Sequence, residues 1–537
     1  MDGDADHIES ATDSPGTGLS RRRFLGAVTV AGAGATGTAL SGCAAPAGGE
    51  PGPSTEPSER AREGDSDWRL RAMGRPGSVV GYTDKSSVLP GERFGLYVST
   101  TSPGFRVSAY RVGWYGGAQA RLVWRSGTLD GRVQGPSHLI PATRTVRAGW
   151  ERTVEVRTDG WPEGAYLLRL DASAGPQRYI PLIVRSRSAA GKTLLIHAPA
   201  TWQAYNLWGG YSLYAGADGQ YATRALAVSF DRPYDGDGAE KFLVYERAAV
   251  VLAERLGIPL AYTTGLDIHS DPSVLEGATA AVSLGHDEYW TPEQRQYLSR
   301  ARDAGTNLAF LGANTCFRRI RLESGPGGEG RTVVCYKSDY QDDPLYPRRP
   351  ALVTTDFRSA PAAAPESLVT GVLYEGYPTD APYVVHNAEH WLFAGTGVKR
   401  GDSFPHLVGV EYDRVVPEAL PRAPIEIVAH SPLTCNGKES YSDSAYYAVS
   451  SGAGVFASGT MRWVEALMAG SGDNGTDHGM DARTGAFVTR TTENLLRAFA
   501  EGPAVKTRSA PKDNVREVYG PAVNTGTWSH AASKTTT

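Results

Sequence analysis

Three short polar clusters in the sequence contain the residue types of a catalytic or metal-binding site. Residues 286–290 have the sequence His-Asp-Glu-Tyr-Trp, and residues 312–314 have the sequence Gly-Ala-Asn. A third cluster, residues 202–210, has the sequence Trp-Gln-Ala-Tyr-Asn-Leu-Trp-Gly-Gly. Together they supply an imidazole, carboxylates, phenols and an amide. These groups suit proton transfer, binding of a metal ion and stabilisation of an oxyanion.

Each cluster also has a purely structural interpretation. Residues 286–288 precede a predicted helix and would cap its N-terminus. Asn314 is a common turn residue, and the aromatic side chains of residues 202–210 suit a core between two domains. We favour a functional site over these structural interpretations because all three clusters follow predicted strands and so converge on one edge of a sheet.

The elements that must position these clusters alternate between strand and helix. Continuous apolar runs at 193–197, 280–285 and 307–312 predict strands that are buried on both faces. Between them lie a helix at 240–256, a strand at 259–264 and a helix at 291–304. This order predicts a doubly wound, parallel α/β sheet, in which ligands bind at the carboxyl ends of the strands.

The segment before this α/β region has a different texture. Short alternating strands between residues 79 and 184, separated by Gly and Pro, predict an antiparallel β-sandwich domain over residues 68–187. We assign residues 188–505 to the α/β domain, including the β-like runs past residue 332, and residues 506–537 to a loose C-terminal tail.

Composition excludes several classes of protein. The chain has 537 residues and a net charge of −4, which argues against an electrostatic nucleic-acid binder. With 41% hydrophobic and 21% charged residues it is not disordered as a whole, and four cysteines are too few for a disulfide scaffold.

The N-terminus has the features of an export signal. Residues 20–25, Ser-Arg-Arg-Arg-Phe-Leu, resemble a twin-arginine motif, and Leu-Ser-Gly-Cys at 40–43 resembles a bacterial lipobox. We therefore expect a signal at 1–42, a lipid on Cys43, a flexible linker at 43–67 and anchoring on the outer face of the cytoplasmic membrane. The alternative is a disordered basic N-terminus with an incidental cysteine.

The three clusters also carry a family resemblance. Trp-Gln-Ala-Tyr-Asn, Gly-His-Asp-Glu-Tyr-Trp and Phe-Leu-Gly-Ala-Asn resemble motifs of the large (beta) subunit of N,N-dimethylformamidase, over about residues 79–499. The resemblance implies an α/β half similar to class I glutamine amidotransferases. It also implies hydrolysis of an amide C–N bond at a mononuclear iron held by two tyrosines and one glutamate.

Carried over by motif, the iron ligands are Glu288, Tyr205 and Tyr166. Tyr166 belongs to the segment Trp-Pro-Glu-Gly-Ala-Tyr of the sandwich, where its alternating position also suits a core residue. Two phenolates and one carboxylate would balance the charge of Fe³⁺, and three protein ligands leave room for water and substrate. A zinc site would more often use His or Cys.

The resemblance also implies roles for side chains around the metal. His286 matches a histidine beside the ligands, Asn314 matches a pocket asparagine, and Glu411 matches a further glutamate, with Glu426 as a competing candidate. His286 or a pocket carboxylate would act as general base, and Asn314 would bind the developing oxyanion.

Alternatives remain open at this stage. The family's enzyme is cytoplasmic and has a small partner subunit, whereas this sequence carries an export signal. Its substrate could therefore be a small amide, a cell-envelope amide, a glycan or something unrelated. The rival interpretation is a non-catalytic envelope-binding protein, and a third is a metal-free hydrolase with a carboxylate pair. Cys316 and Cys335 flank a predicted hairpin, but their spacing alone does not show a disulfide.

Overall fold

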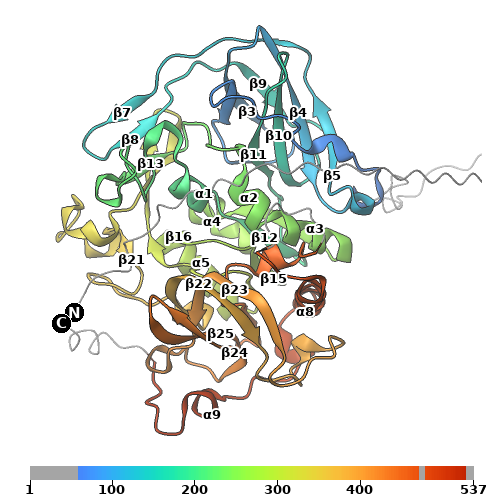
Figure 1. The fold of residues 1–537 in the computed structure, drawn as a ribbon, viewed down its shortest axis with the longest axis vertical. Coiled ribbons are helices and arrows are strands. Elements are labelled where there is room, and N and C mark those ends of the chain that lie inside the picture. Colours follow the sequence, from blue (N-terminus) through green and yellow to red (C-terminus); the bar gives the residue numbers. More distant parts are fainter. Residues whose placement is uncertain (1–58, 471–477, 528–537) are drawn as a thin grey trace, which may run out of the picture.

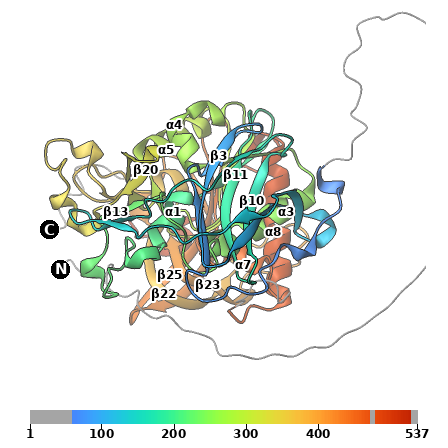
Figure 2. The same ribbon diagram turned by 90° about the horizontal axis from the view of Figure 1, so that it is seen from above.

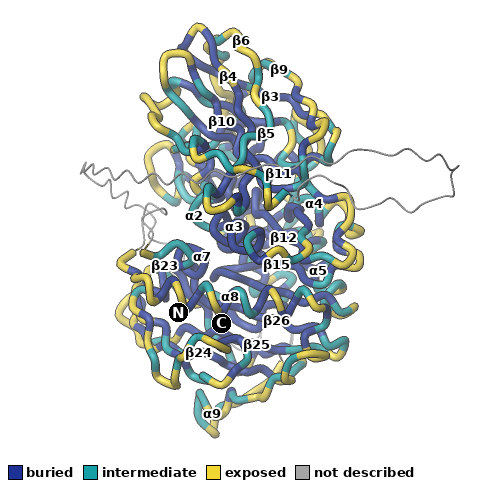
Figure 3. Tube along the Cα trace, turned by 90° about the vertical axis from the view of Figure 1, so that its right-hand side faces the viewer, coloured by how far each residue is buried: buried dark blue, intermediate teal, exposed yellow. Residues whose placement is uncertain are grey.

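The computed structural model describes residues 59–470 and 478–527. The sandwich lies at the top of the molecule, the central sheet and its helices lie in the middle, and long β-hairpins lie below (Figure 1). The predicted export signal and Cys43 lie outside the described residues. The most continuously buried part of the chain is the central layer, and α9 (Val515–Tyr519) lies at the lower tip (Figure 3).

The sandwich is built from two sheets packed face to face. One has the strand order β1 (Val79–Thr83), β3 (Arg93–Thr100), β9 (Val154–Arg157). The other has the order β2 (Ser87–Val88), β11 (Gln177–Val184), β10 (Gly164–Ala172), β4 (Gly104–Val112), β5 (Ala120–Arg125), with β6 (Leu129–Asp130) beside β4. Apart from β2, which runs parallel to β11, neighbouring strands are antiparallel. Apolar side chains from both sheets fill the space between them.

The central sheet of the α/β domain has seven strands. Their order is β14 (Leu260–Thr264), β12 (Thr193–His197), β15 (Ala280–Ser283), β17 (Asn307–Phe310), β26 (Gly454–Ala457), β25 (Lys438–Ala448), β24 (Ile425–Cys435). The first five strands are parallel to one another, β25 is antiparallel to β26, and β24 is antiparallel to β25. β12, β15, β17 and β26 are buried along their whole length, as strands covered on both faces must be.

Helices cover both faces of this sheet. α3 (Arg247–Leu256) and α8 (Ala482–Ala500) share one apolar core with β12 and β15, whereas α4 (Gly265–Ser270) and α5 (Pro292–Asp303) share the other. Viewed from above, α4 and α5 lie together on one side and α3 and α8 on another (Figure 2). The prediction of a mixed α/β-plus-β chain is confirmed, and the likeness to glutamine amidotransferases stays a prediction.

The helix predicted at 240–256 is broken into two. α2 (Glu240–Tyr245) and α3 meet at Glu246, whose carboxylate accepts hydrogen bonds from the indole of Trp202 (2.8 Å) and the amide of Ala198 (3.2 Å). His197 Nδ1 lies 2.5 Å from the same carboxylate. Glu246 thus bonds to groups at the end of β12 and the start of the next helix, which places that helix.

Smaller elements complete the structure. The further strands are β13 (Ala227–Ser229), β16 (Tyr289–Trp290), β18 (Arg318–Arg319), β19 (Arg321–Gly325), β20 (Gly328–Val334), β21 (Thr355–Asp356), β22 (Leu373–Val384) and β23 (Ser403–Arg414). The further helices are α1 (Pro199–Tyr205), α6 (Ser367–Thr370) and α7 (Trp463–Ala466). None of the helices in the described part of the chain has the length and apolar character needed to cross a bilayer.

A hairpin of the sandwich reaches the α/β domain. It consists of β7 (His138–Ile140) and β8 (Thr145–Arg147). The hydroxyl of Thr145 donates to the carbonyl of Ala227 (2.9 Å), and the amide of Ala148 donates to the carbonyl of Asp231 (2.8 Å). The hairpin therefore fixes the sandwich against the segment that leads into α2.

Two segments predicted to be loose are packed instead. Within the predicted linker, Glu59 accepts hydrogen bonds from Tyr115 (2.7 Å) and Arg121 (2.8 Å), so residues 59–67 lie against the sandwich. In the predicted tail, the side chain of Asn514 bonds to both backbone groups of Ile427, and Val515 is fully buried. The reason is that β24 is an edge strand, and the tail covers the start of its open side, at Ile425 and Ile427.

Candidate active site at the carboxyl edge of the central sheet

Four neighbouring parallel strands deliver polar segments to one edge of the sheet. β12 leads into α1, β15 leads into residues 284–288, β17 leads into residues 311–316, and β26 leads into residues 458–462. Because the strands are parallel and adjacent, all four segments emerge at the same edge. The convergence predicted from the sequence for the first three segments is present.

Two glycines allow the segments after β15 and β17 to approach closely. A Cβ on Gly312 would lie 2.3 Å from the carbonyl oxygen of Gly285, and a Cβ on Gly285 would lie 2.2 Å from that of Tyr245. Neither position tolerates a side chain. Beyond the glycines the segments are joined by hydrogen bonds, such as that from the amide of Arg318 to the carbonyl of Glu288 (2.9 Å).

Three side-chain groups meet at this edge. The hydroxyl of Tyr205, in the last turn of α1, lies 2.7 Å from Oε2 of Glu288. The hydroxyl of Tyr214 lies 2.7 and 2.8 Å from the two carboxylate oxygens of Glu288 and 2.9 Å from the hydroxyl of Tyr205. Glu288 is buried, whereas both tyrosines are partly exposed. We call these three residues the oxygen cluster.

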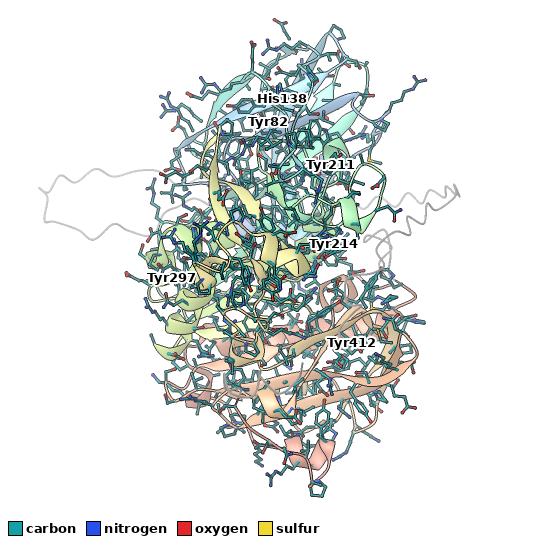
Figure 4. All side chains as sticks on the ribbon, turned by 90° about the vertical axis from the view of Figure 1, so that its left-hand side faces the viewer. Tyr82, His138, Tyr211, Tyr214, Tyr297 and Tyr412 are labelled. Carbon is teal, nitrogen blue, oxygen red and sulfur yellow. The ribbon has the colours of Figure 1, made fainter. Side chains whose placement is uncertain are left out.

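Sequence reasoning missed Tyr214. It lies beyond Gly209 and Gly210, which have φ of 79° and 84° and turn the chain back toward α1. As a result the ring of Tyr214 stacks on that of Tyr205 with centroids 4.4 Å apart. In Figure 4, Tyr214 lies in the middle layer, below Tyr82 of the sandwich and above Tyr412 of β23. The glycine pair was the available signal for this reversal.

His286 lies directly beside the cluster. Its Nε2 is 2.9 Å from the hydroxyl of Tyr205 and 3.6 Å from Oε2 of Glu288. Burial lowers the pKa of His286 to about 4, an effect that the charge of Glu288 opposes. The imidazole is therefore neutral near pH 7 and able to accept a proton.

Three cationic side chains surround the cluster. Arg318 Nε lies 3.2 Å from Oε1 of Glu288, and the same guanidinium also contacts Asp356. The fully buried Lys337 places its ammonium 3.2 Å from the ring centroid of Tyr214. The ammonium of Lys241 lies 4.9 Å from the ring centroid of Tyr205. This positive surrounding favours anionic oxygens in the cluster. Neither Arg318 nor Lys337 was anticipated from the sequence.

Asn314 and Glu411 occupy the neighbouring part of the edge. Asn314 has φ of 59°, its amide N–H donates to Asp413 Oδ1 (2.8 Å), and its own buried Oδ1 has no partner among the described residues. Glu411 is buried two residues before Asp413 on β23, so both face the same side of that strand. Burial raises the pKa of Asp413 to about 7.

The competing candidate Glu426 lies elsewhere. Its carboxylate accepts hydrogen bonds from the side chain of Asn387 (2.6 Å) and the amide of Lys512 (3.0 Å), on the edge strand β24. These bonds give Glu426 a structural role in fixing the C-terminal segment. Of the two glutamates, Glu411 is the one on the strand that contacts the Asn314 segment.

The structure does not bring Tyr166 into the oxygen cluster. Tyr166 is completely buried in the core of the sandwich, and its hydroxyl donates to the carbonyl of Pro162 (2.7 Å). Its ring stacks on Trp161 with centroids 5.2 Å apart. The physical reason is the strand alternation of β10, which turns this side chain between the two sheets. The second tyrosine whose hydroxyl contacts Tyr205 and Glu288 is Tyr214.

The three cysteines within residues 59–470 do not pair with one another. Cys316 and Cys335 are both buried and free, as is Cys435. Cys316 belongs to the core beneath α5, whereas Cys335 belongs to a separate core formed with β13 and β20. They therefore lie in different cores rather than facing each other.

The oxygen cluster has the dimensions of a metal site. Two oxygens bound about 2 Å from one ion lie about 3 Å apart, which matches the separations of 2.7–2.9 Å observed here. Within the described residues, no three side chains drawn from His, Cys, Asp and Glu gather to hold a metal. The donors at this edge are instead two phenols and a carboxylate, a set that suits a hard trivalent cation.

The central sheet is an open α/β sheet, and the oxygen cluster lies at its carboxyl edge. Proteins with this architecture usually bind their ligands at that edge. Residues 106–478 match the family described as "N,N-dimethylformamidase beta subunit-like, C-terminal". The chain belongs to this family, which suggests a dimethylformamidase-like amide hydrolase.

Other comparisons add little. No curated protein matches the chain. Among solved structures, a cycloisomaltooligosaccharide glucanotransferase from Paenibacillus sp., complexed with cycloisomaltoheptaose, matches 46% of this chain and 29% of its own length, with 10% identity and a TM-score of 0.15. An overlap this small carries no information on fold or function.

Proposed function

We propose that the protein is an exported, lipid-anchored hydrolase that cleaves an amide C–N bond with a mononuclear ferric ion. Membership of the dimethylformamidase-like family supports the reaction class. The observation that carries the metal assignment is the convergence of two phenol oxygens and one carboxylate within 2.7–2.9 Å of one another. We therefore assign the ligands as Tyr205, Tyr214 and Glu288.

The protonation chemistry of the cluster supports this assignment. Burial raises the pKa of Tyr214 well above its ordinary value, and the negative charge of Glu288 raises it further. Without a cation, Tyr214 is therefore a neutral phenol that donates to Glu288. A bound Fe³⁺ would favour the phenolate form of Tyr214 over the neutral phenol. It would also polarise an amide carbonyl and lower the pKa of bound water.

The residues around the cluster supply the remaining steps. His286, neutral at pH 7, takes a proton from the attacking water and returns it to the departing nitrogen. Asn314 lies in the segment that follows β17 at the same edge, and its Nδ2 would donate a hydrogen bond to the oxygen of the substrate carbonyl as negative charge develops. Glu411 is a further buried carboxylate available for proton transfer on this side.

Export and anchoring rest on the sequence alone. The twin-arginine motif at 20–25 and Cys43 lie outside the described residues, and we propose that they place the enzyme on the outer face of the cytoplasmic membrane. The substrate is then a small amide or an amide of the cell envelope. We also retain the likeness of the α/β half to class I glutamine amidotransferases as part of this proposal.

Elemental analysis with an absorption spectrum tests the proposal. Protein purified after native export is expected to contain about one iron per chain and to show a visible phenolate-to-iron band. A screen of small amides should then reveal hydrolysis. Iron-free, colourless protein without amidase activity would favour the non-catalytic envelope-binding alternative. Iron-free protein with activity would favour a hydrolase that uses a carboxylate pair.

A further inference from the structure

Arg232 is a fully buried arginine that binds main-chain carbonyls instead of a carboxylate. Its Nη1 donates to the carbonyls of Trp208 (3.0 Å) and Tyr211 (2.7 Å). Its Nη2 donates to the carbonyls of Gln203 (3.3 Å) and Asn206 (2.8 Å). No carboxylate of the described residues lies within ion-pair distance of Arg232. Burial lowers its pKa to about 10, so the guanidinium stays charged at neutral pH.

These four carbonyls belong to one continuous piece of chain, residues 203–211. It comprises the end of α1 and η4 (Trp208–Gly210). The last carbonyls of a helix lack partners within the helix and carry the negative end of its dipole. A buried guanidinium with five N–H donors is well suited to satisfy them and to fix their relative positions.

The residues that follow Arg232 reinforce this attachment. Asp235 accepts a hydrogen bond from the amide of Leu207 (2.9 Å). Asn206 accepts one from the amide of Asp235 (3.0 Å) and donates one to the carbonyl of Pro233 (2.8 Å). Residues 232–235 therefore hold the loop at several points along its length.

The loop connects the two phenols of the oxygen cluster. Tyr205 lies between the first two carbonyls that Arg232 binds, those of Gln203 and Asn206, and Tyr214 follows three residues after the last of the four. Where the loop closes, the amide of Leu213 donates to the carbonyl of Ala204 (2.9 Å). The separation of the two hydroxyls therefore depends on the path of this loop.

We propose that Arg232 is a positioning residue for the oxygen cluster, because it fixes the loop that returns the hydroxyl of Tyr214 to those of Tyr205 and Glu288. This inference rests on the proposed metal-binding function of the cluster. Without the guanidinium, four carbonyls lose its N–H donors, two of them in buried hydrogen bonds, and the loop gains freedom to relax away from α1.

The test compares Arg232→Met and Arg232→Lys with Arg178→Met. Arg178 is also a buried arginine that donates to main-chain carbonyls, those of Met73 and Gln177, but it lies on β11 of the sandwich. In Arg232→Met, we expect iron affinity to fall about 10–100-fold and the visible band to shift. The iron affinity and spectrum of Arg232→Lys should be intermediate between those of Arg232→Met and the wild type. Arg178→Met should match the wild type in both.

Amide hydrogen exchange supplies a readout that needs no metal. Peptides covering 203–214 should exchange about tenfold faster in Arg232→Met than in wild type or Arg178→Met. Unchanged exchange in this segment would overturn the inference, as would faster exchange with unchanged iron affinity and spectrum. If the wild type itself holds no iron, the proposed function fails, while the exchange experiment still decides whether Arg232 holds the loop.

Discussion

Tyr166 in the sandwich and Tyr214 in the α/β domain show how differently two regions use the same side chain. Tyr166 has no exposed surface, and its hydroxyl is satisfied by a carbonyl four residues away. Tyr214 is partly exposed, and its hydroxyl meets a buried carboxylate that lies 74 residues further along the chain. The sandwich uses its tyrosine to fill a core, whereas the α/β domain brings polar groups together where its strands end.

The lesson concerns position rather than residue type. Strand alternation directs Tyr166 between two packed sheets, where any side chain must be covered. The loop after α1 leaves the sheet at its carboxyl edge, where side chains from several strands can converge. A tyrosine at such an edge is available to a ligand, and one between two sheets is not.

The largest effect should come from Glu288→Gln, which keeps the shape of the side chain and removes its charge. Because Glu288 contacts both phenols, we expect the variant to lose iron and to lose amidase activity by at least about 100-fold. Metal analysis and initial rates measure the two losses. Glu323→Gln, at an exposed glutamate on β19, is the control. Full iron occupancy in Glu288→Gln would break the assignment of the cluster.

His286→Asn should lower kcat by about 10²–10⁴-fold while iron is retained. In the wild type, burial depresses the pKa of His286 to about 4. The neutral base is therefore present above that value, and activity should be lost as pH falls through about 4. A pH–rate profile for both proteins measures this. An acid limb that persists unchanged in the variant would assign proton transfer to another group.

The comparison of the two tyrosines is tested directly by Tyr214→Phe and Tyr166→Phe. The first removes an oxygen from the cluster and should weaken iron binding about 10–100-fold and shift the visible band. The second leaves only the carbonyl of Pro162 without a donor and should cost about 1 kcal/mol of stability. Iron titration, absorption spectra and thermal unfolding separate the two. Loss of the visible band in Tyr166→Phe would instead support Tyr166 as an iron ligand.

The smallest expected effect is on stability and concerns Asp413. Burial raises its pKa from 3.8 to about 7, so the folded state retains a proton that the unfolded state has lost. The contribution of Asp413 to the free energy of unfolding is therefore complete below about pH 4, and it is lost as pH rises through about 7. The free energy of unfolding of Asp413→Asn should therefore equal that of the wild type at pH 4 and exceed it by about 1 kcal/mol or more at pH 8. Denaturant unfolding at both values measures this, and parallel pH dependences would contradict it.

Much of the site could be inferred from local patterns. The apolar runs before residues 286–288 and before Asn314 predict strands, and the strand-end rule then predicts that His286, Glu288 and Asn314 lie together. Tyr205 follows from the same rule, because its helix comes directly after β12. The helix predicted over 240–256 also ends where expected, at Leu256, and the next residue, Gly257, has φ of 68°.

Other features depend on contacts between distant parts of the chain. The helix break at Glu246 follows from its bonds to His197 and Trp202, almost 50 residues earlier. The packing of the C-terminal segment follows from the open edge of β24. Neither contact leaves a local signature in the sequence, so both segments were assigned by local texture alone.

By itself, the sequence determined the order of strands and helices, the edge at which the polar clusters emerge and the family to which the chain belongs. These follow from hydrophobic periodicity and from short motifs, which act over a few residues. Only the tertiary structure decided which second tyrosine meets Glu288, which cations surround it and how Arg232 holds the loop between the two phenols. Such choices depend on distances between segments far apart in the chain, and close packing fixes those distances only when the whole domain is assembled.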